Sequence, residues 1–173
     1  MPRLGQPFRE PWASLRVRSA RRYNSPMRIE QANQDDLSEW LRMARLLWPE
    51  DSDDVLRQEW EEMLTSDHQT TFFGEDDDGR HVAFVAVSVR SDYVEESNSR
   101  PVGYLEGLYV DEEYRHRGIG KRLVQVAESW AKERGCKEMG SDTWDWNTDS
   151  IAFHEKVGFT KGETLVHFIK RIS

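Results

Sequence analysis

The segment 110–121 constrains the fold more than any other part of the sequence, because it joins a strand to a helix through a glycine-containing basic loop. An apolar run at 102–110 precedes it, and the apolar periodicity of a helix at about 119–134 follows. Amides at a helix N-terminus lack intrahelical partners and carry the positive end of the helix dipole. Two glycines let a phosphate approach these amides closely, and three cations add countercharge: Arg115, Arg117 and Lys121. The segment therefore predicts a diphosphate site between a sheet and a helix.

Two common phosphate loops do not fit this segment. A Walker A loop needs Gly where Arg115 stands and Ser or Thr where Arg122 stands. A dinucleotide-binding fingerprint needs the spacing G-x-G-x-x-G, which the segment lacks.

The rest of the chain from Met27 reads as alternating helices and strands. Four strands before one strand–loop–helix–strand unit predict a mixed sheet with helices on both faces, an α/β or α+β fold. A turn is expected at 76–79. The other expected strands are 28–31, 70–74, 82–90, 137–142 and 159–170, and the other expected helices are 35–48, 53–64 and 148–156.

Charge divides the 173-residue chain into two parts. Residues 1–26 hold six Arg and one acid, lack periodicity and are expected to lie outside the fold, which leaves 27–173 as one domain. This domain has 18 basic and 31 acidic residues, which disfavours nucleic acid and anionic lipid and favours a cationic partner, although such charge also serves solubility alone. A single cysteine, no Cys/His metal-ligand spacing and no apolar run of membrane-spanning length predict a cytoplasmic protein without a metal or a membrane segment.

The pattern R-x-x-G-x-G, here Arg115 to Gly120, resembles the acyl-CoA loop of the GNAT acetyltransferase superfamily. The stretch 147–159, with its N…A-F-H-E-K-V-G-F pattern, resembles a second superfamily motif. The resemblance implies a mostly antiparallel sheet that splays at an acetyl-CoA cleft, with a bulge near Gly107. It also implies the positions that bind acetyl-CoA: Leu108, Tyr109, Val110, Arg115, His116, Arg117, Gly118, Ile119, Gly120, Lys121 and Asn147.

Five dispersed fragments resemble one subgroup of this superfamily, the aminoglycoside 6'-N-acetyltransferases. They are L-L-W-P at 46–49, S-D-Y-V at 91–94, Y-L-E-G-L-Y-V at 104–110, C-K-E-M-G-S-D-T at 136–143 and G-E-T at 162–164. In that subgroup the matching positions line the antibiotic pocket: Trp48, Tyr93, Glu106, Asp142 and Glu163. Carboxylates suit the ammonium groups of an aminoglycoside, and aromatic rings suit its sugar faces. Trp144 and Trp146 depart from the subgroup and receive no role.

Acetyl transfer to an amine needs a base, an oxyanion donor and an acid for the leaving thiolate. Glu106 is the candidate base, and strand alternation predicts that it shares a face with Tyr104 and Leu108. The amide of Leu108 is the candidate oxyanion donor. His154 stands where the superfamily has a tyrosine acid, so it is a candidate acid, although an interior histidine without a catalytic role is an equal interpretation.

Two alternatives remain open from the sequence. The enzyme could acetylate another amine, such as a polyamine, a small metabolite or a protein amine. The domain could also bind acetyl-CoA without turnover. A homodimer is expected by analogy with related enzymes.

Overall fold

The computed structural model describes residues 27–172, so the prediction for residues 1–26 lies outside the described part of the chain. Five strands form one sheet in the order β1-β2-β3-β4-β5. The first four are antiparallel neighbours, and β5 lies parallel to β4, which confirms the mixed, mostly antiparallel sheet. The strands are β1 (Arg28–Gln31), β2 (Gln69–Glu75), β3 (His81–Arg90), β4 (Val102–Val110) and β5 (Met139–Ser141).

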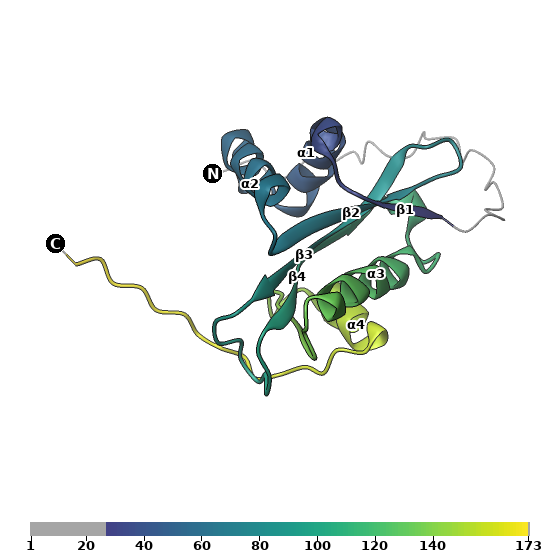
Figure 1. The fold of residues 1–173 in the computed structure, drawn as a ribbon. Coiled ribbons are helices and arrows are strands. Elements are labelled where there is room, and N and C mark those ends of the chain that lie inside the picture. The colour runs from purple at the N-terminus through teal and green to yellow at the C-terminus, as the bar shows by residue number, and fades with distance from the viewer. Residues whose placement is uncertain (1–26, 173) are drawn as a thin grey trace, which may run out of the picture.

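Helices cover both faces of the sheet, as the sequence predicts (Figure 1). On one face lie α1 (Leu37–Leu47) and α2 (Asp53–Thr65), whose Trp40 and Trp60 pack with Phe73 and Phe84 of the sheet. On the other lie α3 (Ile119–Glu133) and α4 (Thr148–Val157). There Leu123 and other apolar side chains of α3 pack on β3.

Local signals place most helix ends correctly. Ser52 caps α2 by accepting from the amide of Val55, and Gly158 ends α4 with a φ of 110°. The first predicted helix is the exception, because its first turn is the 3-10 helix η1 (Gln34–Asp36), which Asn33 caps before α1 begins. A second 3-10 helix, η2 (Glu112–Tyr114), follows β4.

The strand predicted at 159–170 is wrong for this structure, in which residues 159–172 form neither helix nor strand. Large apolar side chains of the segment are exposed: Leu165, Val166, Phe168, Ile169 and Ile172. A strand needs an edge to pair with, and this segment extends away from the sheet (Figure 1). β5 is also shorter than predicted, with Met139–Ser141 in place of 137–142.

Within residues 27–172, no helix is both long enough and apolar enough to cross a membrane. The same residues contain no group of three or more His, Cys, Asp and Glu side chains arranged to hold a metal ion.

Candidate active site

A β-bulge at Glu106 is the centre of the candidate site. The register of β3 and β4 shifts between Ala86, which pairs with Gly107, and Val87, which pairs with Leu105. Glu106 is therefore the extra residue of β4, with no register partner on β3. The bulge predicted near Gly107 is confirmed, one residue earlier.

The bulge reverses the alternation of side chains along β4. Leu105 packs in the cluster beneath α3, and so does Leu108, three residues later. Glu106 instead reaches Ser88 and Arg90 of β3. The prediction that Leu108 shares the face of Glu106 is wrong, because one inserted residue moves each later side chain to the opposite face.

Beyond the bulge, β4 separates from β5. The two strands pair at Gly103, Tyr104 and Leu105, and in the described chain the pairing extends no further. The amide of Asp111 donates to the Val82 carbonyl at 2.8 Å, so by antiparallel alternation the backbone groups of Leu108 and Val110 face away from β3. They point into the opening between the strands, as an acyl-CoA arm requires.

The loop after β4 presents backbone amides at the start of α3. His116 and Gly118 both have positive φ, 60° and 81°, which turns the chain sharply into the helix. Gly118 is the N-cap, and no side chain caps α3. The first helical amides, of Ile119, Gly120 and Lys121, therefore lack the acceptor that a capping side chain would supply.

The basic side chains of this loop are exposed, and two of them contact other groups of the loop. The guanidinium of Arg115 donates to the Val110 carbonyl at 3.0 Å, and that of Arg117 lies 5.3 Å from the ring centroid of Tyr114. Lys121 is exposed on the first turn of α3.

The two glycines of the loop differ in their physical role. A Cβ on Gly118 would meet nothing within 4 Å, so its positive φ is the reason for glycine. A Cβ on Gly120 would lie 2.9 Å from the ring of Phe153, so there glycine allows α4 to pack against α3.

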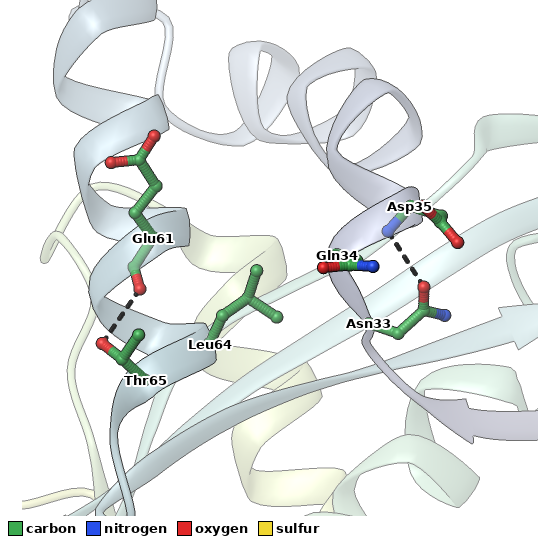
Figure 2. A pocket seen from close by; sticks show the side chains of 6 residues that line it. All are labelled: Asn33, Gln34, Asp35, Glu61, Leu64 and Thr65. Atoms are coloured by element: carbon green, nitrogen blue, oxygen red, sulfur yellow. Dashed lines mark hydrogen bonds between the residues drawn. The ribbon is translucent and has the colours of Figure 1, made fainter.

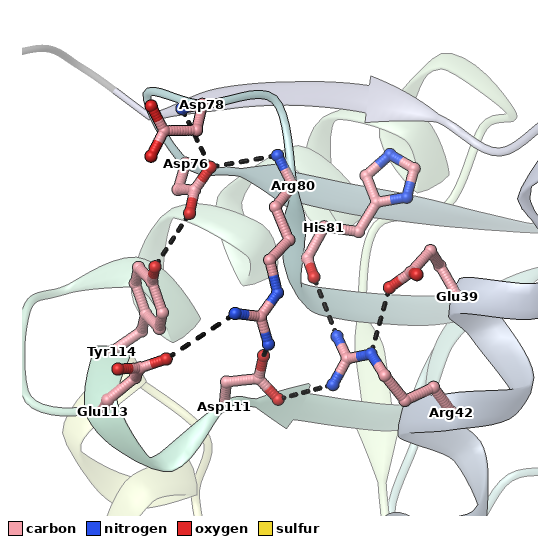
Figure 3. Close-up of polar contacts among 9 residues, drawn as sticks. All are labelled: Glu39, Arg42, Asp76, Asp78, Arg80, His81, Asp111, Glu113 and Tyr114. Carbon is pink, nitrogen blue, oxygen red and sulfur yellow. Dashed lines mark hydrogen bonds and ion pairs between the residues drawn. The ribbon is translucent and has the colours of Figure 1, made fainter.

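Asp111 fixes the beginning of the loop (Figure 3). It is buried, and it accepts from Arg42 of α1 at 3.0 Å and from Arg80 at 3.5 Å. Arg42 also donates to the His81 carbonyl at 2.8 Å and to Glu39 at 3.0 Å. The network ties the end of β4 to α1 and to the start of β3.

On the face of α1 and α2, Glu106 lies in a polar cluster that the sequence did not indicate. It accepts from the Ser88 hydroxyl and forms a two-point ion pair with Arg90 at 2.7 and 3.1 Å. The Arg90 guanidinium lies over the ring of Tyr104, whose hydroxyl donates to Asp142 at 2.7 Å. Burial and the hydrogen bond to Asp142 raise the pKa of Tyr104 far above its ordinary value, so the phenol stays protonated.

Trp48 also lies beside the bulge. A Cβ on Gly107 would meet its ring at 2.5 Å, so the indole covers the backbone next to Glu106. Glu59 of α2 is close enough to interact with Glu106: burial first, and then the charges of Asp51, Glu62 and Glu106, raise the pKa of the Glu59 carboxyl. No sequence motif surrounds the other members of the cluster, Ser88, Arg90 and Glu59. Only their contacts in the folded structure identify them as candidate site residues.

Tyr93 and Glu163 are the other two residues that were predicted to line the acceptor pocket. Tyr93 is exposed, with Arg100 at 6.0 Å from its ring centroid. The amide of Glu163 donates to Glu96 at 2.9 Å. Among the described residues, neither side chain bonds to Glu106 or Asp142, so their predicted roles in the acceptor pocket stay predictions. Trp144 and Trp146, left without a role, are exposed and nearly parallel, with an angle of 11° between their planes.

His154 has a protein partner at each ring nitrogen. Nδ1 lies 2.7 Å from the Ser150 carbonyl, and Nε2 lies 2.9 Å from the Ser141 hydroxyl. The Ser150 carbonyl can only accept, so Nδ1 carries a proton, and Nε2 faces the Ser141 hydroxyl, which also lies 3.1 Å from the Leu105 carbonyl. Asn147 caps α4 by accepting from the Ser150 amide at 3.2 Å.

A pocket of about 600 Å³ lies away from this cluster, between η1 and the last turns of α2 (Figure 2). Its polar groups already serve the helix ends: Asn33 accepts from the Asp35 amide, and Thr65 donates to the Glu61 carbonyl. None of the candidate site residues lines it.

The sequence was compared with families and proteins of known function. Residues 34–159 match the acetyltransferase (GNAT) family. An aminoglycoside N(6')-acetyltransferase type 1 of Serratia marcescens is 41% identical over 138 residues, which are 80% of this chain and 94% of the relative. The type 1 enzyme of Salmonella typhimurium is 37% identical over 145 residues, 84% of this chain and 99% of the relative.

Solved structures agree with these matches. The aminoglycoside acetyltransferase AAC(6')-Iy, in complex with the bisubstrate analogue CoA-S-monomethyl-acetylneamine, superposes with a TM-score of 0.82 at 37% identity. The superposition covers 86% of this chain and 100% of that one. The 6'-N-acetyltransferase AAC(6')-Ih of Acinetobacter baumannii gives the same TM-score and coverage at 38% identity.

Proposed function

Because the chain belongs to the acetyltransferase (GNAT) family, among its aminoglycoside 6'-N-acetyltransferases, we propose that it transfers acetyl from acetyl-CoA to the 6'-amine of aminoglycosides. The observation that carries this proposal is the similarity of 37–41% identity over nearly the full length of relatives with that activity. The polar cluster at Glu106 supports it, because an acidic pocket beside the opening of the sheet suits an ammonium acceptor. Transfer by direct attack in a ternary complex would inactivate the antibiotic and give resistance.

Acetyl-CoA supplies the activated thioester, and the residues of the opening fit its parts. The outward-facing backbone groups of Leu108 and Val110, on either side of Tyr109, suit the amides of the pantetheine arm, which would lie along β4 as an added strand. The amides from His116 to Lys121, with Arg115 and Arg117, suit the diphosphate. To bind the diphosphate, the guanidinium of Arg115 must release its hydrogen bond to the Val110 carbonyl.

On the acceptor side, Glu106 takes a proton from the 6'-ammonium and leaves a neutral amine to attack the thioester carbonyl. Trp48 bounds the pocket at the bulge, and Asp142 holds a second cationic group. Tyr93 and Glu163 act at the rim, where an acceptor of two or three rings reaches them. The Leu108 amide stabilises the oxyanion.

The leaving thiolate takes its proton through Ser141. The hydroxyl of Ser141 lies 2.9 Å from Nε2 of His154. When both ring nitrogens carry a proton, Nε2 passes its proton to the Ser141 oxygen as the Ser141 hydroxyl proton moves to the thiolate. The ring is neutral after this step, and its Nδ1 stays bonded to the Ser150 carbonyl. Ser141→Ala should therefore lower kcat as much as His154→Ala does.

A CoA-release assay tests the function. Kanamycin, tobramycin and amikacin, which carry a 6'-amine, should each release CoA. A 6'-hydroxyl aminoglycoside should bind but react poorly, and spermidine serves as the polyamine control. NMR of the product should place the acetyl group on the 6'-nitrogen. Reaction with spermidine alone would assign the enzyme to polyamines, and no CoA release with any amine would favour the binding module.

The exposed C-terminal segment supports a homodimer. Phe168 and Ile169 are 93% and 100% exposed, and exposure of such large apolar side chains to water is unfavourable in an isolated chain. We infer that this segment packs on a second copy. The wild type should sediment as a dimer and Phe168→Asp as a monomer; a monomeric wild type would contradict this.

We place the reaction in the cytoplasm, where acetyl-CoA is available. The free, buried Cys136 suits a reducing compartment. Fractionation of expressing cells should recover the acetyltransferase activity with the cytoplasmic enzymes.

A further inference from the structure

The carboxylate of Glu106 has unequal oxygens. Oε1 accepts two hydrogen bonds, from the Ser88 hydroxyl and from Nε of Arg90 at 3.1 Å. Oε2 accepts one, from Nη2 of Arg90 at 2.7 Å. A carboxylate oxygen has about two lone pairs for hydrogen bonds. Oε1 is therefore fully used, and Oε2 keeps one free position.

Arg90 is itself held in place. Its guanidinium carbon lies 3.3 Å from the ring centroid of Tyr104, a contact distance for a cation on an aromatic face. Tyr104 is 8% exposed, and its hydroxyl is fixed by Asp142. The side chain of Arg90 is thus clamped between a buried ring and the carboxylate, although it is 41% exposed.

Ser88 and Arg90 reach Glu106 together because of strand geometry. They stand two residues apart on β3, so they share a face. Glu106 lies on the same face of the sheet, two residues after Tyr104, which pairs with Ser88.

We propose that Arg90 is a positioning residue that, together with Ser88, fixes Glu106 so that only Oε2 can take the acceptor's proton. This inference rests on the proposed amine acetylation. The ammonium loses one proton to Oε2, which gives a neutral amine and a carboxylic acid, and the acid later returns the proton to water.

The test compares Arg90→Gln, Arg90→Lys and Ser88→Ala with Arg45→Gln. Arg45 forms a similar two-point ion pair with Asp53, at 2.8 and 2.6 Å, on the surface of α1 and α2. It is therefore a matched control for loss of an Arg–carboxylate pair outside the site. Steady-state rates are measured from pH 5 to 9 with kanamycin and with spermidine.

For Arg90→Gln we expect kcat to fall by about 10- to 100-fold, the usual effect of a misplaced catalytic group, with an unchanged KM for acetyl-CoA. The acceptor KM should change much less than kcat, because a misplaced base slows proton transfer without removing a contact to the ammonium. Arg90→Lys should recover only part of kcat, since an ammonium makes one contact where the guanidinium makes two. Ser88→Ala should lower kcat less than Arg90→Gln, because it frees Oε1 without releasing the side chain.

Three outcomes would overturn the inference. An unchanged kcat in Arg90→Gln would make the pair structural only. A higher kcat with a lower acceptor KM would show that Arg90 competes with the ammonium. An equal loss in Arg45→Gln would indicate a general effect on the fold, which melting curves of all variants would reveal. If the wild type acetylates spermidine but no 6'-amine, the proposed substrate fails, and the Arg90 comparison is decided with spermidine.

Discussion

Removal of the Asp111 carboxylate should destabilise the domain and loosen the acetyl-CoA loop together. Asp111 is 7% exposed and accepts from Arg42 and Arg80 (Figure 3). Asp111→Ala leaves the Arg42 guanidinium without one of its two carboxylate partners, while the bonds to Glu39 and the His81 carbonyl remain. The variant therefore tests whether the ion pairs of Asp111 affect acetyl-CoA binding as well as stability.

The magnitude follows from burial. Breaking a buried ion pair by removing one partner costs about 3–5 kcal/mol. The Arg42 side chain is 32% exposed and keeps two acceptors, so water and these acceptors offset part of the cost. We expect a loss of about 2 kcal/mol in the free energy of unfolding, which corresponds to a fall of about 4–8 °C in Tm for a chain of this size.

Urea unfolding and calorimetry with acetyl-CoA measure the two effects. Because Asp111 begins the loop, its loss should raise the Kd for acetyl-CoA more than the KM for the acceptor. Asp53→Ala, which breaks the exposed pair with Arg45, is the control and should cost much less stability. A loss of stability no larger than that of Asp53→Ala would refute the stabilising role of the buried Asp111 ion pairs. An unchanged Kd for acetyl-CoA in a destabilised Asp111→Ala variant would refute the claim that Asp111 positions the loop.

Four further substitutions test other parts of the structure. Gly118→Val should weaken acetyl-CoA binding in calorimetry, with a stability loss of about 1–2 kcal/mol from its positive φ. Gly120→Val should lower Tm further than Gly118→Val, because its Cβ meets a ring of α4; equal effects of the two on Tm would contradict this difference. Glu59→Gln should raise the acceptor KM. It should also stabilise the protein slightly at pH 7, because the raised pKa of Glu59 means that folding disfavours its ionised form. This gain in stability should vanish as the pH falls below 4.5, the ordinary pKa of a glutamate. Tyr114→Phe should lower the free energy of unfolding by about 1 kcal/mol at pH 7. Burial raises the pKa of Asp76, but hydrogen bonds that include one from the Tyr114 hydroxyl lower it further, so the net shift is downward. The stability that these bonds contribute is therefore present above pH 3.8 and is lost as the pH falls below this value. A penalty for Tyr114→Phe that is independent of pH would contradict this assignment.

Local pattern was enough to predict the elements that position the loop. β4 has the predicted bounds, Val102–Val110, and α3 begins at the predicted Ile119, because a clear apolar strand and a clear helical period meet at a glycine N-cap. Helix ends that depend on one capping residue, such as Ser52, were also predictable. These signals act within a few residues, so one sequence contains them in full.

Pairing between distant segments was not predictable in the same way. Period-two alternation put Leu108 on the face of Glu106, but the register of β3 against β4 decides where the extra residue lies. The pair of Arg42 and Asp111 joins residues 69 positions apart, and neither has a local signal for it. The C-terminal segment alternates like a strand, yet a strand forms only where an edge accepts it.

The bulge explains how one strand can serve two substrates of opposite charge. Before it, Tyr104 faces Arg90 and Asp142 on the acceptor side. After it, β4 has left β5, and the backbone of Leu108 and Val110 faces the opening that leads to the basic loop. The single extra residue at Glu106 lies where the pairing of β4 with β5 ends, between the carboxylates of Asp142 and Glu59 and the backbone that leads to the basic loop. In the proposed mechanism, amine and thioester meet at this point.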